Sequence, residues 1–302
     1  MSWRQRLLIG FAALTVLVAS GIVYLGSRVE EFIVEQGPSG AFLAARQADR
    51  LNDADSAGMF YSQALMARPG DETLMREAMQ AQIMAGRFDE ALLTANQIVE
   101  SDGETRQARL LLAIHAFKMG LYDDTNAHLN EMARGPFTEL LTPNIRLWSA
   151  VALQQEEAQQ RAINRLTRSS VFAAAQFVQA ATAYELAGDV EKARGLYERA
   201  LRSGGARYLF MVLAYGEFMQ RHGDADKAEK LYDFYDERNL PHAHVAAARQ
   251  RLAQGAPLSV EAAPAAGLAQ AFAALGEAMQ AENRNELSLS FLRVAQYLDP
   301  SD

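Results

Sequence analysis

The sequence predicts an all-α solenoid of helix hairpins, and the first observation behind this prediction is a recurring turn signature. Four glycines each stand three residues before an acidic residue, and these pairs recur 34, 68 and 35 residues apart: Gly86 with Asp89, Gly120 with Asp123, Gly188 with Glu191, and Gly223 with Asp226. A glycine after an apolar helical run provides the left-handed residue that ends a helix, and an acid just beyond it favours the start of the next helix. Each copy therefore indicates a helix, a tight turn and a second helix.

The second observation is a small residue after each turn, with a tyrosine four residues later in most copies. The pairs are Ala57 with Tyr61, Ala91 with Ala95, Ala193 with Tyr197, and Ala228 with Tyr232. Residues four apart share one face of a helix, so the alanine lets two helix backbones approach while the tyrosine fills the space between units. Because a single hairpin cannot bury this face alone, the pattern predicts stacked copies.

These spacings resemble the tetratricopeptide repeat family, whose consensus has small residues, aromatics, a turn glycine and a late proline at fixed positions. The resemblance covers roughly residues 38–302 and implies about seven units, at 38–71, 72–105, 106–139, 140–173, 174–207, 209–242 and 269–302. It implies that the following residues pack the repeats: Ala57, Tyr61, Gly86, Ala91, Gly120, Gly188, Ala193, Tyr197, Gly223, Ala228, Tyr232, Gly276, Ala295 and Pro300.

The fourth unit departs from the pattern. Gln154 and Gln159 occupy the positions where glycine and alanine are expected, and Pro143 falls inside the expected first helix, where it would remove a hydrogen bond. We therefore expect that helix to begin near Asn144, and the register of this unit stays open.

The N-terminal segment, residues 1–27, differs from the repeats. Arg4 and Arg6 precede a charge-free run from Leu7 to Leu25, which as a helix is about 28 Å long, close to the thickness of a bilayer core. This predicts one membrane anchor or uncleaved signal before a juxtamembrane linker at 28–37; the alternative is a signal cleaved after small residues such as Ala19. The arginines indicate that the repeats are translocated, so we expect them in the bacterial periplasm, held at the inner membrane or, after cleavage, soluble.

The regular spacing of the turns is interrupted after the first six units, at residue 242. Residues 243–268 contain a helix-like stretch followed by an Ala/Pro/Gly-rich loop, before the last unit at 269–302. This segment predicts either a hinge between two sub-arrays or a loop inserted into a continuous superhelix. The last unit has no polar capping helix after it, so we expect another molecule or self-association to cover its face, unless the protein continues.

Composition and motifs argue against nucleic-acid binding, metal binding and catalysis by this chain. The net charge of -8 disfavours general nucleic-acid binding, and the lack of cysteine excludes thiolate metal sites and disulfides. His242 and His244 are two residues apart, which places them on different faces of a helix, so no metal site is expected. We expect no catalytic residue and no cofactor.

In the family, the first helix of each unit lines a concave groove that holds the ligand. Carried onto this chain, the groove positions are Arg76, Gln80 and Ile83 in the second unit, Leu110, Ile114 and Phe117 in the third, and Phe210, Leu213 and Glu217 in the sixth. The apolar middle is suited to an amphipathic helix or an extended hydrophobic peptide of a partner. The alternative is that Leu110, Ile114 and Phe117 pack against a neighbouring helix.

Two functions follow as expectations. The first is a non-enzymatic protein-interaction scaffold tethered to the cell envelope, with a protein or peptide of unknown identity in the groove. The second is an accessory or chaperone subunit of an export, envelope-assembly or polysaccharide-secretion system.

Overall fold

The computed structural model describes residues 38–101, 105–133, 135–239, 241–255, 258–260 and 263–300. Every regular element in these ranges is helical, which confirms the predicted all-α class. The anchor predicted at residues 1–27 and the linker at 28–37 lie outside the described residues. Among the helices that are described, none is long and apolar enough to cross a membrane.

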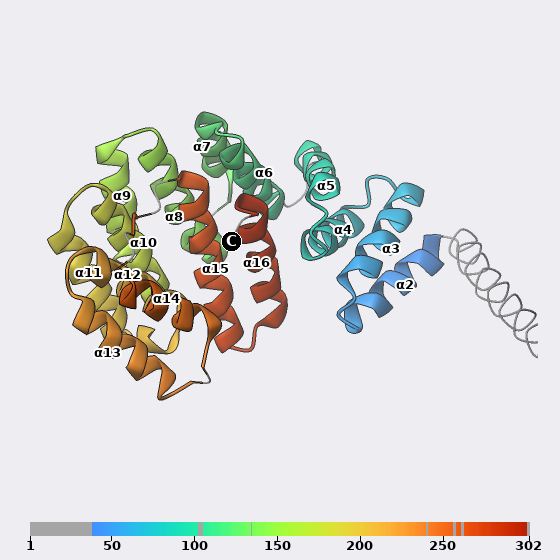
Figure 1. The fold of residues 1–302 in the computed structure, drawn as a ribbon. Helices are drawn as coiled ribbons and strands as arrows, with labels where there is room; N and C mark the ends of the chain where they lie inside the picture. Colours follow the sequence, from blue (N-terminus) through green and yellow to red (C-terminus); the bar gives the residue numbers. More distant parts are fainter. Residues whose placement is uncertain are drawn as a thin grey trace, which may run out of the picture.

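The helices follow one another as hairpins, each closed by a tight turn (Figure 1). In the described ranges these hairpins are α2 (Pro38–Arg50) with α3 (Ala54–Ala67), α4 (Glu72–Met84) with α5 (Phe88–Glu100), α6 (Arg106–Lys118) with α7 (Tyr122–Glu131), α8 (Pro136–Ala152) with α9 (Glu156–Leu166), α10 (Ala173–Leu186) with α11 (Val190–Arg202), α12 (Leu209–Arg221) with α13 (Ala225–Asp236), and α15 (Pro264–Ala281) with α16 (Asn285–Leu298). Helix α14 (Ala243–Ala253) packs on α12 and α13, and a short 3-10 helix, η1 (Gly205–Arg207), precedes α12.

The turn inside each hairpin repeats one backbone conformation. The predicted glycines Gly86, Gly120, Gly188 and Gly223 have φ angles of 75°, 74°, 79° and 81°. The equivalent residues of the other three hairpins, Asn52, Gln154 and Asn283, take the same left-handed conformation with φ of 56°, 55° and 59°. Because this conformation normally favours glycine, Gln154 shows that the fourth unit keeps the register of the others although it lacks the glycine.

The small residues after the turns lie where the helices approach most closely. Ala57, Ala91, Ala193 and Ala228 are completely buried, as are Tyr61 and Tyr232, and Tyr197 is 1% exposed. In the last hairpin Gly276, on the first helix, allows α15 and α16 to approach closely, because a Cβ atom there would lie only 3.0 Å from Leu292 Cγ of α16. Ala295 is also buried, whereas Pro300 follows the end of α16 and is exposed.

The prediction that the first helix of the fourth unit begins near Asn144 is wrong. Helix α8 begins at Pro136 and continues through Pro143 to Ala152. Two side-chain amides bind the helix beside the proline: Asn144 Nδ2 and Gln176 Nε2 both donate to the carbonyl of Leu140, at 3.0 and 3.4 Å. Buried Leu141 and Trp148 lie on either side of Pro143, so packing stabilises the whole length of the helix against the local preference of proline.

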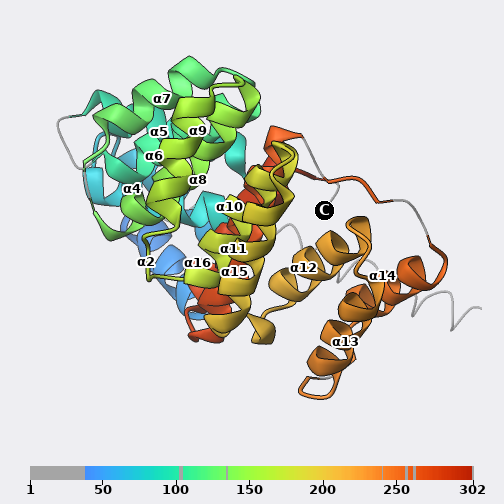
Figure 2. The same cartoon turned by 90° about the vertical axis from the view of Figure 1, so that its left-hand side faces the viewer.

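The hairpin α15–α16 does not continue the stack of repeats. Helix α15 packs against α8, α10 and α12, and α16 packs against α4. Figure 1 shows the two red helices in the middle of the array, between α8 and α10 on one side and α4 on the other, and Figure 2 shows α15 next to α10 from a second direction. The last unit is a hairpin, as predicted, but it begins at Pro264 rather than at residue 269, so residues 264–268 are helix and not loop. The alternative of a loop inserted into a continuous superhelix is wrong, because the segment after α14 returns the chain to the inside of the array.

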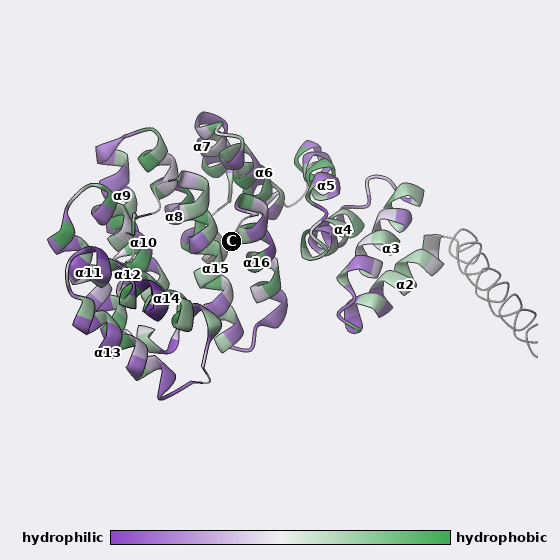
Figure 3. Cartoon of the chain, viewed as in Figure 1, coloured by the Kyte–Doolittle hydropathy of each residue, from purple (hydrophilic) through white to green (hydrophobic). Residues whose placement is uncertain are grey.

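The hydrophobic core reflects this placement. One cluster joins side chains of α4 to α8 with side chains of α15 and α16, a second runs from α8 to α14, and a smaller third one lies within α2, α3 and α4. Polar residues gather on outer helices such as α11 and α13 (Figure 3).

Candidate interaction site

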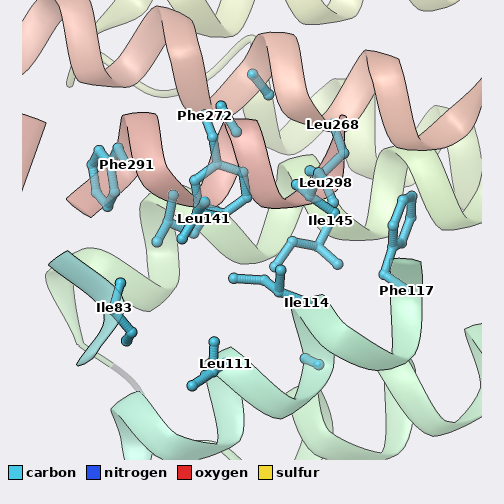
Figure 4. Close-up of a cluster of buried hydrophobic side chains, with 14 of the residues drawn as sticks. Ile83, Leu111, Ile114, Phe117, Leu141, Ile145, Leu268, Phe272, Phe291 and Leu298 are labelled. Atoms are coloured by element: carbon cyan, nitrogen blue, oxygen red, sulfur yellow. The ribbon is translucent and has the colours of Figure 1, made fainter. Parts of the chain in front are cut away.

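Apart from Arg76, the predicted groove residues of the second and third units pack with the hairpin α15–α16. Ile83, Ile114 and Phe117 are 9%, 2% and 1% exposed, and they belong to the same buried cluster as residues of the hairpin. Figure 4 shows Ile114 and Phe117 below Leu268 and Leu298 of the hairpin. Leu110 is half-buried and packs against this cluster. This part of the concave surface is thus filled by the chain itself, which agrees with the alternative that these residues pack on a neighbouring helix.

Polar contacts fasten α16 to the array. Gln80 Nε2 donates to Ser290 Oγ at 2.9 Å, and Arg293 Nε donates to the carbonyl of Met84 at 3.1 Å. The ring of Tyr297 stacks on Phe88 with 4.0 Å between centroids, and its hydroxyl lies 2.6 Å from Nδ1 of His115. Lys118 Nζ donates to the carbonyl of Tyr297. Arg76, the third predicted residue of the second unit, is half-buried, and its Nη2 lies 3.5 Å from Thr73 Oγ1 of the same helix.

A carboxylate of α15 binds the start of α12. Glu277 accepts hydrogen bonds from the backbone N–H groups of Leu209 and Phe210, at 2.5 and 3.0 Å. These N–H groups open α12 and have no partner inside the helix, so a negative charge there is favourable. Burial raises the pKa of the Glu277 carboxyl, and the two N–H donors act in the opposite direction.

The predicted groove residues of the sixth unit line an open cleft. A cavity of about 920 Å³ lies between α10, α12 and α14 on one side and the hairpin α15–α16 on the other. Phe210, Leu213 and Glu217 contribute to the wall formed by α12. Leu289 and Leu292 contribute to the opposite wall, where the side chain of Leu292 is 42% exposed.

Two arginines that line the cleft are paired with carboxylates of the protein. Arg251 Nη2 of α14 lies 2.6 Å from Glu217 Oε1. Arg221 binds both carboxylate oxygens of Glu185, at 2.8 and 2.9 Å, and the Glu185 side chain is only 3% exposed. Two further charged residues of the lining bind backbone groups, Arg293 the carbonyl of Met84 and Glu277 the N–H groups of Leu209 and Phe210. Between these charges the lining includes apolar side chains such as Leu213 and Leu289.

Nothing in the described ranges assembles three or more histidines or carboxylates that could hold a metal ion. His242 and His244 both line the cleft. His242 Nδ1 accepts from the backbone N–H of His244 at 3.3 Å, so this ring serves as the cap of α14.

This geometry defines the class of protein: an array of helical repeats whose inner surface is packed with the helices α15 and α16. Residues 50–114 match the family model described as tetratricopeptide repeat. Among solved structures, a tetratricopeptide repeat protein from Parabacteroides merdae is similar over 86% of this chain and 98% of its own, with 14% sequence identity and a TM-score of 0.56. The chain therefore resembles the tetratricopeptide repeat family, as its sequence indicates. That family is generally non-catalytic and suggests a protein-interaction scaffold, which is consistent with the expectation that the chain is not an enzyme.

A second solved structure, of MamA protein, aligns with 74% of this chain and 98% of its own at 15% identity, but its TM-score of 0.32 is too low to bear on the fold. No curated protein matches the chain.

Sequence reasoning missed the contacts of the hairpin α15–α16. Glu277 and Leu292 line the cleft, whereas Ser290 and Tyr297 contact α4, α5 and α6. The composition of residues 264–281 gives one signal for these contacts. Leu268, Phe272, Leu275 and Met279 lie on one face of the helix, and alanines make most of the remaining surface apolar. A helix that is apolar all round packs against neighbours on more than one face, which a terminal helix of an open stack would not do.

Proposed function

We propose that the chain is a non-enzymatic protein-interaction scaffold tethered to the cell envelope, and that it binds a short helical segment of a protein partner in the cleft between α12 and the hairpin α15–α16. The observation that carries the proposal is this cleft of about 920 Å³, lined by Phe210, Leu213 and Glu217. It is the part of the predicted groove that the hairpin leaves open.

A helix is the occupant that the surroundings support. The concave surface already takes α15, which packs on α8, α10 and α12, and the cleft continues the same wall along α12. A helix about 10 Å wide rises 1.5 Å per residue, so a space of this volume holds about eight residues, roughly two turns. The paired charges and the apolar walls favour a segment that presents uncharged, apolar side chains.

The tether is proposed from the sequence alone. The charge-free run Leu7–Leu25 is long enough to span a bilayer, and Arg4 and Arg6 before it favour translocation of the repeats to the periplasm. Carbonate extraction of membranes tests it: the full-length protein should stay in the membrane fraction with its N-terminus intact. A soluble mature protein that begins near Gly21 would overturn the tether and leave the cleft untouched.

Two exposed leucines allow a matched test of the cleft. Leu292→Glu places a charge on the cleft wall, whereas Leu93→Glu places the same charge on α5 outside the cleft, where Leu93 is 68% exposed. Burying one apolar side chain contributes about 1.5–3 kcal/mol, so we expect Leu292→Glu to reduce partner recovery at least about tenfold, and Leu93→Glu to leave it unchanged.

The assay is affinity purification from membranes with quantitative mass spectrometry, on variants whose helicity by circular dichroism matches the wild type. Proteins lost with Leu292→Glu must also be lost with Leu213→Glu on the opposite wall. The partner segment, made as a peptide, must then bind the wild type at least about tenfold more tightly than Leu292→Glu. Equal recovery by Leu292→Glu, Leu93→Glu and wild type refutes binding in the cleft.

A further inference from the structure

The hairpin α15–α16 occupies the surface on which the family resemblance places the partner. Ile83, Ile114 and Phe117 face Phe272, Phe291 and Leu298 in one buried cluster. These are contacts of the kind that an apolar helix makes in a groove, here within one chain. The hairpin is therefore an internal occupant of the concave surface over α4, α6 and α8.

The hairpin is also a separate packing unit. Its two helices pack most closely on each other, with Gly276 against Leu292 and the carbonyl of Ser288. Tight turns join the helices within each repeat, whereas α14 and α15 are connected by the longer segment 254–263, in which Gly255 has a left-handed φ of 59° and no described residue is helical. Repeats in a solenoid are held by contacts with their sequence neighbours, and from α2 to α13 each hairpin packs on the next one along the chain.

The polar contacts across the interface lie in two small groups. One group contains Gln80 with Ser290 and Tyr297 with His115, and the other contains Glu277 at the start of α12. Apolar packing lies between them. Because both groups belong to one two-helix unit, release of that unit exchanges both of them for water together.

We propose that α15–α16 is a latch: it leaves the concave surface as one unit while the repeats stay folded, and so controls access to the apolar faces of α4, α6 and α8. The latch would control access to the binding surface of the scaffold, so this inference rests on the proposed scaffold function. Its movement requires no partner, so it can be tested on the protein alone, and failure of the latch is distinguishable from failure of partner binding.

The absence of cysteine from the sequence makes a single introduced thiol a clean reporter. Ser290→Cys places the thiol under the hairpin, where Ser290 is 8% exposed, and Thr125→Cys places a control thiol at the small-residue position of the third repeat, where Thr125 is completely buried. In native buffer we expect Ellman's reagent to react with Ser290→Cys more than about tenfold faster than with Thr125→Cys. A smaller ratio, with the same steep urea dependence for both thiols, means that the hairpin is released only when the repeats unfold, and it overturns the latch.

A second measurement guards against an effect of Ser290→Cys itself. The double variant Gln80→Cys with Ser290→Cys is cross-linked across the interface, and hydrogen exchange is followed by mass spectrometry before and after cross-linking. The latch predicts that amides of α15 and α16 exchange more than about tenfold faster than those of α10 and α11 before cross-linking, and that cross-linking removes the difference. Equal exchange in the two hairpins before cross-linking overturns it.

Discussion

Gly267→Ala tests directly whether α15 packs on α8. A Cβ atom at Gly267 would lie 2.2 to 2.3 Å from three ring carbons of Trp148, where carbon atoms in contact need about 3.5–4 Å. The Trp148 ring cannot yield easily, because it is completely buried and its Nε1 donates to Gln179 Oε1 at 2.8 Å. Alanine is favoured over glycine inside a helix by about 1 kcal/mol, whereas overpacking a core costs about 1–3 kcal/mol. Because the obstacle is a rigid ring, we expect a net loss of about 1–2 kcal/mol in the free energy of unfolding.

Gly195→Ala is the matched control for this substitution. Gly195 lies inside α11 with nothing within 4 Å of an added Cβ atom, so the change should stabilise the protein by about 0.5–1 kcal/mol. Urea unfolding followed by circular dichroism at 222 nm measures both variants against the wild type. If Gly267→Ala gains as much stability as Gly195→Ala, the hairpin does not rest on Trp148 and its placement inside the array is wrong.

Two further predictions concern carboxylates. Glu185→Ala removes the bidentate partner of buried Arg221, whose other carboxylate neighbour, Glu217, lies at 4.0 Å, and should cost about 3–5 kcal/mol, measured as a lower urea midpoint. Glu157→Ala, whose side chain is 95% exposed, should leave the midpoint unchanged. Similar midpoints for the two variants would contradict the buried pair. Burial raises the pKa of Glu277 above the 4.5 of an exposed glutamate, so the stability that protonation provides is present below 4.5 and lost as the pH rises through the folded-state pKa. The wild type should therefore gain stability relative to Glu277→Gln as the pH falls from 7 toward 4.5, and a difference independent of pH would show that this carboxyl is not buried against α12.

The parts of the fold that depend on local sequence could be predicted. Turn glycines such as Gly86, and the alanine and tyrosine pairs such as Ala193 with Tyr197, act over a few residues, and their spacing alone indicates the hairpins. Pro143 misled the prediction because its local cost is outweighed by packing on both sides of α8, which the sequence does not display. Gln154 likewise takes a conformation that its own preference disfavours, because the flanking helices determine the turn.

The candidate site was predictable only in part. Phe210, Leu213 and Glu217 line the cleft, as expected from the repeat positions. The cover over Ile114 and Phe117 was not predictable, because it depends on a segment of the chain far away in sequence, and repeat periodicity carries no information about contacts between distant units.

The hydrogen bond between Gln80 and Ser290 joins residues that are 210 positions apart. Solenoids ordinarily fold through contacts between neighbours, and such local topologies form quickly. Here the apolar face of α6 stays uncovered until α16 has been synthesised. At about 5–20 residues per second of synthesis, that wait is roughly 10–35 s, long enough for a nascent chain to aggregate or to meet a chaperone. The same placement that buries the groove in the finished protein thus leaves it bare on the ribosome, which makes the yield of folded protein sensitive to the rate of translation between α6 and α16.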